Sequence, residues 1–244
     1  MKTHDMVNTP FRIGFLLFPN ITQLDLTGPY EVLSRMARAE MILVWKTREP
    51  VRADSGLTIL PTATFAECPQ LDLICVPGGG GVNPLLTDAD TLDFVRRQAA
   101  AARYVTAVCT GALVLGAAGL LKGRRAVTHW MSMDFLKAFG AIPVDERVVV
   151  DGNVITGGGV TAGIDFGLRV VADFVGEVAA RAIQLEIEYD PRPPFDSGHP
   201  RNADPALVER AKAAAETRQA ERRSQVEKAA SARQESASHF KLHV

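Results

Sequence analysis

The chain has 244 residues, of which 47% are hydrophobic and 23% are charged, and its formal net charge is −1. A chain of this length can bury a sizeable core as one large domain or two small ones. No apolar run approaches the ~18 residues that a membrane span requires. The basic residues are spread along the chain and do not gather into the patch that nucleic-acid binding requires. Composition therefore predicts a small-molecule partner, with no nucleic acid and no membrane.

The first ten residues, MKTHDMVNTP, contain no apolar segment and do not resemble a signal peptide. We therefore expect residues 1–10 to form an N-terminal tail of a cytoplasmic protein. The three cysteines have no CxxC spacing, which argues against a disulfide framework and a zinc site. The five histidines are scattered without HxxH spacing, so the sequence predicts no metal site.

Alternating strands and helices are predicted from residue 11 onward. Short apolar runs that end at turn residues are typical of buried parallel strands, and they fall at 11–18, 71–76 and 104–109. Segments with helical periodicity fall at 29–39, 91–102, 112–121, 161–176 and 177–189. Two hairpins are expected, around Ser55-Gly56 and around Asp151-Gly152. This alternation predicts a doubly wound, mostly parallel α/β sheet with helices on both faces.

One domain is expected to cover residues 11–200, ending in the proline-rich loop DPRPPFDSGHP. Residues 201–244 are rich in Ala, Arg, Glu, Gln and Lys and contain few large apolar side chains. Such a composition is typical of a solvated helix or a flexible extension. We therefore expect the C-terminal extension to carry no chemistry and to be dispensable for catalysis.

The segment AVCTG places Cys109 where a predicted strand meets a predicted helix, with the small residues Ala107 and Gly111 two positions away on either side. This spacing is typical of a sharp strand-to-helix turn that lifts a nucleophile above the sheet. Backbone N–H groups at the start of a helix favour a negative charge, so the pKa of this thiol is expected to fall. The alternative, about equally weighted from local sequence, is that Cys109 is a small buried hydrophobic residue.

Other segments that follow predicted strands supply possible partners. Asp25 lies in LDLTGP between two leucines, and it is either a proton carrier or a helix cap. The run PGGGG brings the backbone N–H groups of Gly79 and Gly80 toward a bound substrate, but it lacks the GK[ST] of a phosphate loop. In TGGGVTAG, Val160 either lines the same pocket or belongs to a plain turn.

The remaining candidates carry weaker signals. Cys75 lies inside a predicted buried strand and is expected to be inert, and nothing near Cys68 would activate that thiol. His129 in VTHW is either a core residue, which we favour, or a base that pairs with the cysteine.

Together, LDLICVPGG, AVCTGALVLGAAGLL, RRAVTHW and TGGGVTAGIDFGL resemble the ThiJ/PfpI superfamily of glutamine-amidotransferase-like folds. Within it, LDLTGP, VCTG and LEIEYDPRPPF are most similar to isocyanide hydratases. The resemblance implies a flavodoxin-like sandwich, a homodimer and no metal or organic cofactor. It also implies that Cys109 is the nucleophile and Asp25 its acidic partner. The chain departs from peptidase members of the superfamily, which have histidine directly after the cysteine, because it carries Thr110 there.

The resemblance implies hydration of an isocyanide to an N-substituted formamide through a Cys109 thioimidate, with Thr110, Gly79 and Gly80 positioning the reacting groups. Two alternatives remain open. One is a ligand-sensing domain like that of AraC-type regulators, without its DNA-binding module; the other is a glyoxalase or redox-stress member of the same superfamily.

Overall fold

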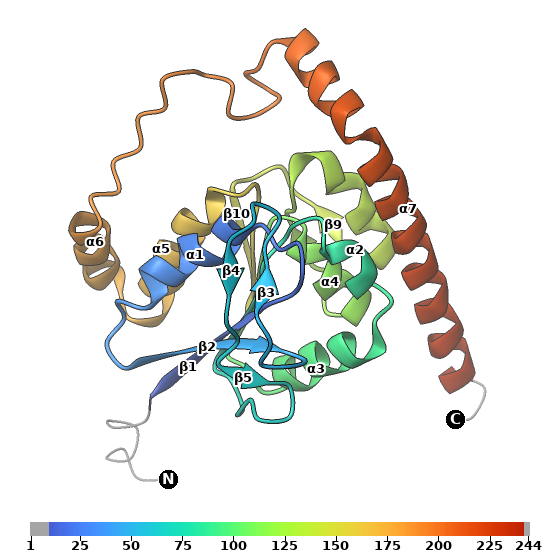
Figure 1. The fold of residues 1–244 in the computed structure, drawn as a ribbon, viewed down its shortest axis with the longest axis horizontal. Helices are drawn as coiled ribbons and strands as arrows, with labels where there is room; N and C mark the ends of the chain where they lie inside the picture. Colours follow the sequence, from blue (N-terminus) through green and yellow to red (C-terminus); the bar gives the residue numbers. More distant parts are fainter. Residues whose placement is uncertain (1–9, 242–244) are drawn as a thin grey trace.

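The computed structural model describes residues 10–241, and a seven-stranded sheet lies at its centre (Figure 1). The predicted N-terminal tail, apart from Pro10, lies outside the described residues. The strands of the sheet are β1 (Phe11–Leu16), β2 (Ala39–Trp45), β5 (Ala63–Thr64), β6 (Leu73–Val76), β7 (Tyr104–Val108), β10 (Val148–Asp151) and β11 (Val154–Gly157).

The strand order is β10-β11-β7-β6-β1-β2-β5, and every neighbouring pair is parallel except β10 with β11. The chain places β2 on one side of β1 and then continues with β6 on the other side of β1. The loops that follow β1, β6 and β7 therefore meet at the carboxyl ends of these neighbouring parallel strands. In a doubly wound sheet this edge is where ligands bind. The predicted mostly parallel α/β sheet is confirmed.

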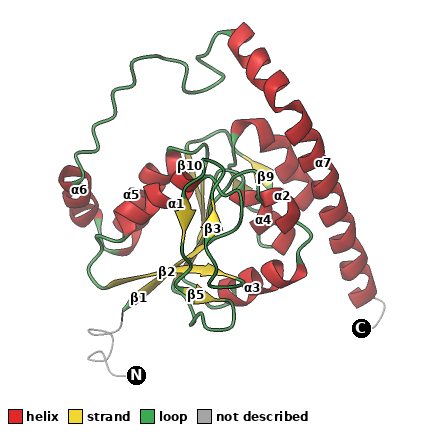
Figure 2. Cartoon of the chain, viewed as in Figure 1, coloured by secondary structure: helices red, strands yellow, loops and turns green. Residues whose placement is uncertain are grey.

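Helices cover both faces of the sheet, as Figure 2 shows in red. One face carries α1 (Gln23–Leu33), α5 (Ala162–Phe174) and α6 (Glu177–Glu186). The other carries α2 (Val82–Leu85), α3 (Ala89–Ala99), α4 (Gly111–Ala118), the 3-10 segment η2 (Trp130–Phe139) and α7 (Pro205–Lys241). Five helices were predicted in these regions, but α1 begins at Gln23, six residues before the predicted start, because Pro29 lies inside the helix and does not begin it.

Both predicted hairpins are present. β3 (Val51–Arg52) pairs antiparallel with β4 (Thr58–Ile59), and β10 pairs antiparallel with β11. A short parallel pair, β8 (Arg125–Ala126) with β9 (Ile142–Pro143), was not predicted, and neither was β2. β2 follows directly on the predicted helix 29–39. Four of its seven side chains are only partly buried and one is exposed, so it lacks the fully apolar pattern of the strands that were recognised.

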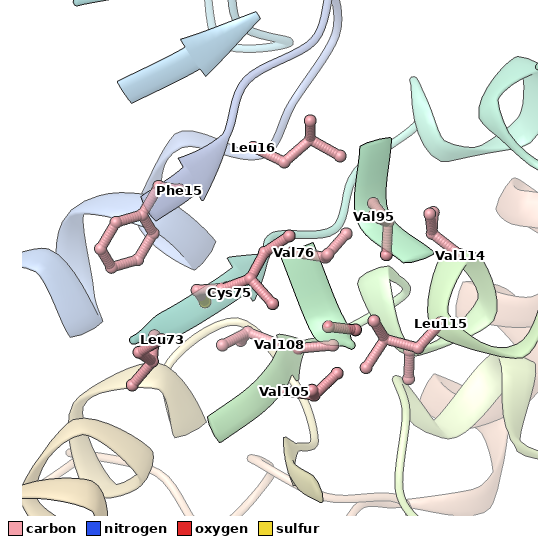
Figure 3. Packing of buried hydrophobic residues seen from close by; sticks show 14 of the residues in the cluster. Phe15, Leu16, Leu73, Cys75, Val76, Val95, Val105, Val108, Val114 and Leu115 are labelled. Atoms are coloured by element: carbon pink, nitrogen blue, oxygen red, sulfur yellow. The ribbon is translucent and has the colours of Figure 1, made fainter. Parts of the chain in front are cut away.

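Apolar side chains from the central strands fill the space between the sheet and its helices (Figure 3). Phe15 on β1, Leu73 and Cys75 on β6 and Val105 on β7 are all buried to within a few per cent. Burial raises the pKa of the Cys75 thiol to about 12. Cys75 is therefore an inert packing residue, as the sequence indicates.

The C-terminal helix α7 packs along η2, α2 and α4. Its buried apolar residues are Ala215, Val226 and Ala229, and Arg223 lies over the ring of Phe135 at 5.3 Å. Between α6 and α7 the chain runs as a long segment without helix or strand, residues 187–204, around one side of the molecule (Figure 1). Within residues 10–241, no helix is long and apolar enough to cross a membrane.

Candidate functional site

Cys109 sits on a sharp turn between β7 and α4. Its φ is +55°, in the left-handed region that non-glycine residues rarely adopt. A Cβ on Gly111 would lie 2.0 Å from the carbonyl oxygen of Val76, so only glycine fits two residues after the cysteine. Hydrogen bonds fix the turn: the Cys109 N–H donates to Gly157 O (2.9 Å), and Thr128 Oγ1 donates to Cys109 O (2.7 Å). The predicted elbow geometry is therefore present.

The Cys109 side chain is buried, with only 5% of it exposed. The elbow interpretation led us to expect a side chain that points to the surface, whereas the alternative interpretation of Cys109 expected it to be buried. Burial raises the pKa of its thiol well above the usual value, and the nearby charge of Asp25 raises it further, while the Thr110 N–H lowers it. The expected low pKa is thus corrected, because desolvation of a thiolate outweighs the favourable backbone N–H groups.

Asp25 lies in the first turn of α1 and is fully buried. Its Oδ2 accepts a hydrogen bond from the Gly78 N–H at 3.0 Å, so the side chain bonds across to the glycine loop and does not cap its own helix. Burial raises its pKa to about 7, and the interactions with the Cys109 thiol and with Gly78 oppose this rise. An acid of this pKa exchanges a proton readily near neutral pH.

The glycine loop after β6 holds the acid and the elbow together. A Cβ on Gly78 would lie 2.7 Å from Asp25 Oδ2 and 2.6 Å from the Thr110 nitrogen, so a side chain here would separate the two. The Gly79 N–H donates to Thr110 Oγ1 at 3.0 Å. Thr110 therefore links the residue after the cysteine to the glycine loop.

A cavity of about 160 Å³ opens above the cysteine. Six of the seven predicted site residues line it: Cys109, Thr110, Gly79, Gly80, His129 and Val160. The seventh, Asp25, is buried directly behind Cys109. Pockets for drug-sized ligands typically hold ~300–1,000 Å³, so this cavity suits a smaller molecule.

His129 lines the cavity as a neutral side chain. Its Nδ1 accepts a hydrogen bond from the Met131 N–H at 3.3 Å, at the start of η2. Burial, together with the charges of Arg222 and Arg218, lowers its pKa to about 4. His129 and Val160 also border a second cavity of about 380 Å³, so they form the partition between the two spaces.

The C-terminal helix forms one wall of the cavity, through Arg218, Gln219 and Arg222. We expected this extension to contain no site residue, and the structure corrects that expectation. The buried positions of α7 are 215, 222, 226 and 229, which follow heptad spacing. That spacing was the available signal, but three of the four residues are small or charged, so hydrophobic periodicity does not reveal it. Within the described part of the chain, no cluster of three or more His, Cys, Asp or Glu side chains is arranged to hold a metal ion.

The fold and the site together define a class of α/β protein with a cysteine at the end of a central parallel strand. Residues 11–173 match the DJ-1/PfpI family, and the chain belongs to this family. It is 59% identical over 201 residues to an isonitrile hydratase of Pseudomonas putida, an alignment that covers 82% of this chain and 88% of that protein. It is 33% identical over 190 residues to the HTH-type transcriptional regulator GbdR of Pseudomonas aeruginosa, covering 74% of this chain but 51% of the regulator.

Among solved structures, a ThiJ/PfpI family protein from Pseudomonas syringae superposes with a TM-score of 0.86 at 42% identity. The superposition covers 94% of this chain and 96% of that one. The 6% of the 244 residues that the superposition leaves uncovered amounts to fewer residues than the 37 of α7. The shared architecture therefore extends into the C-terminal helix.

Proposed function

We propose that this protein is an isocyanide hydratase, which converts an isocyanide and water to an N-substituted formamide. The observation that carries the reaction type is a buried carboxyl group with a pKa of about 7 beside a cysteine on a strained elbow. The substrate class follows from the 59% identity to the isonitrile hydratase of P. putida. The small cavity suits an isocyanide with a compact substituent.

In the first step, the ionised Asp25 takes the proton of the Cys109 thiol, and the resulting thiolate attacks the terminal carbon of R–N≡C. Asp25 then donates this proton to that carbon, which gives the thioimidate R–N=CH–S–Cys109 and leaves Asp25 ionised again. Covalent catalysis of this kind divides one difficult addition into two easier ones. Asp25 suits this role because its pKa of about 7 lets it accept and return a proton near neutral pH.

In the second step, a water molecule adds to the thioimidate carbon. One proton of the water passes to the substrate nitrogen and the other returns to Asp25. The C–S bond then breaks, which releases R–NH–CHO and regenerates the thiolate. We assign to Thr110, Gly79 and Gly80 the positioning of the acid and the reacting atoms, since Thr110 Oγ1 accepts from the Gly79 N–H and all three residues line the cavity. Val160 and the neutral His129 limit the room for the substituent.

The test is incubation of the purified protein with a small alkyl isocyanide, with formation of the formamide followed by NMR. We expect turnover in the wild type, none in Cys109→Ala, and retained turnover in the matched control Cys75→Ala, whose thiol lies in the core. Isocyanide binding without formation of formamide would contradict the proposed enzymatic activity and favour the ligand-sensing alternative. Turnover of a 2-oxoaldehyde in place of the isocyanide would favour the glyoxalase alternative.

A further inference from the structure

Arg222 is a buried cation on the wall of the thiol cavity. Only 3% of it is exposed, although it lies on a helix whose neighbouring residues face solvent. Its Nε donates to Asn83 Oδ1 (2.9 Å), its Nη1 to Ser132 Oγ (3.1 Å) and its Nη2 to the Gly79 carbonyl oxygen (3.3 Å). All three acceptors are uncharged. Across the described residues, Arg222 forms no ion pair with an aspartate or glutamate.

A buried charge without a counter-charge is costly, so the position of Arg222 calls for a negative partner. Arg222 and Cys109 line the same small cavity. Burial lowers the pKa of Arg222 to about 10, while the charge of Cys109 acts to raise it. The effect is mutual, because Arg222 acts to lower the pKa of Cys109.

We propose that Arg222 is the counter-charge of the Cys109 thiolate, so that the C-terminal helix supplies a positioning residue to the site. The inference rests on the proposed function only in taking Cys109 as the nucleophile. It does not depend on which substrate the thiolate attacks.

The other charged groups around the cavity do not fill this role. They come from four elements: Asp25 on α1, Asp54 in the β3–β4 turn, His129 at the start of η2, and Arg218 on α7. Asp25 raises the pKa of the thiol, and Asp54 is also a carboxylate, so neither supplies a positive charge. His129 is neutral because its pKa lies at about 4, and Arg218 is exposed, where water screens its charge. Arg222 is therefore the buried cation available to Cys109.

The hydrogen bond to Gly79 also fixes where the cation sits. The Gly79 carbonyl accepts from Arg222, and the Gly79 N–H donates to Thr110 Oγ1, so one glycine connects α7 to the residue after the cysteine. The guanidinium is thereby bound to the same glycine loop that contacts Asp25 through Gly78.

The test is the pH dependence of Cys109 alkylation by iodoacetamide, followed by mass spectrometry of the peptide that contains Cys109. We expect Arg222→Gln to move the midpoint upward by about 1 pH unit or more, the size of shift that an adjacent opposite charge produces. Arg222→Lys keeps the charge and is expected to stay closer to the wild type. The matched control is Arg223→Gln, which removes the neighbouring charge from α7 outside the cavity and is expected to leave the midpoint unchanged.

Docking of α7 is measured in each variant by limited proteolysis within residues 187–204. A wild-type midpoint in Arg222→Gln would overturn the proposal. Equal shifts in Arg222→Gln and Arg222→Lys would also overturn it, because the effect would then follow packing and not charge. Alkylation requires no isocyanide, so absence of hydration in the wild-type protein would overturn the proposed function while the Arg222 result still stands by itself.

Discussion

Asp25 is the residue at which catalysis and stability oppose each other. Its pKa is about 7 in the folded protein and near 4 when exposed, so the folded state binds more protons between these values. Its contribution to stability therefore falls as pH rises from about 4 to 7. Above pH 7 the cost of the buried carboxylate reaches up to about 4 kcal/mol, at 1.36 kcal/mol for each pH unit.

We therefore predict that Asp25→Asn lowers turnover by about 10²–10⁴-fold, the usual contribution of general acid–base catalysis. The same change is expected to raise the melting temperature at pH 8, because Asn keeps an acceptor for the Gly78 N–H and never ionises. Steady-state rates and thermal unfolding at pH 5 and pH 8 are the measurements. A mass spectrum that shows a persistent Cys109 adduct would place Asp25 in the hydrolytic step. Wild-type turnover in this variant would remove Asp25 from the mechanism and make His129 the next residue to change.

The tight turn around Cys109 could be predicted from the sequence, because it depends only on residues close to Cys109 in the chain. The small residues around Cys109 indicate a tight turn, because the backbone of Gly111 lies too close to the Val76 carbonyl oxygen for a side chain to fit. This constraint can be recognised in the five-residue segment AVCTG. The burial of Cys109 was not predictable in the same way. It depends on α7 and η2 closing over the elbow, and neither is encoded near position 109.

The role of helix α7 as a wall of the cavity was not predicted from the sequence. Its buried face consists of Ala215, Arg222, Val226 and Ala229, and three of these four residues are small or charged. Such a face packs closely but adds little to hydrophobic periodicity, so the helix resembles a solvated one. The three acceptors of Arg222 lie 90, 139 and 143 residues away in the sequence, beyond the reach of any local pattern.

We predict that Val226→Asp detaches α7 and lowers turnover at least tenfold. Val226 is 2% exposed, and a carboxylate there would be buried without a partner. Detachment would remove Arg222 and Gln219 from the cavity wall. Cleavage within residues 187–204 measures detachment, and formamide production measures activity.

The matched control is Lys228→Asp, which places the same carboxylate on the exposed side of α7. We expect this variant to keep both protection and turnover. If the Val226→Asp variant were cleaved within residues 187–204 but still hydrated the isocyanide at the wild-type rate, α7 would cover the site without taking part in catalysis.

For the whole molecule, local strand and helix periodicities predicted β1, β6, β7, both hairpins and five helices, but not β2, the β8–β9 pair or η2. Assembly between copies is a separate matter. The outer side of α6 exposes two large apolar residues seven positions apart, Val178 (84% exposed) and Leu185 (82%). We propose that these two residues contribute to the interface of the expected homodimer, where burial of their side chains would be favourable.

The corresponding prediction is that the wild-type protein has a solution mass of twice 26.3 kDa by light scattering, and that Leu185→Lys shifts it to the monomer. Leu60→Lys is the control, because Leu60 is also exposed (62%) but lies just after the β3–β4 hairpin. A dimer that survives Leu185→Lys would place the interface elsewhere, and a monomeric wild type would overturn the dimer.

The long path from the glycine loop to α7 also sets an order of events in time. β6, β7 and the elbow assemble from segments close together in the chain, whereas Arg222 must return to Gly79 across 143 residues. Closing so long a loop is entropically unfavourable and slow compared with local contacts. We therefore predict that the wall formed by α7 is the last part of the site to form as the chain folds. In that order of events, the thiol and its acid would be in place but open to water before α7 encloses them.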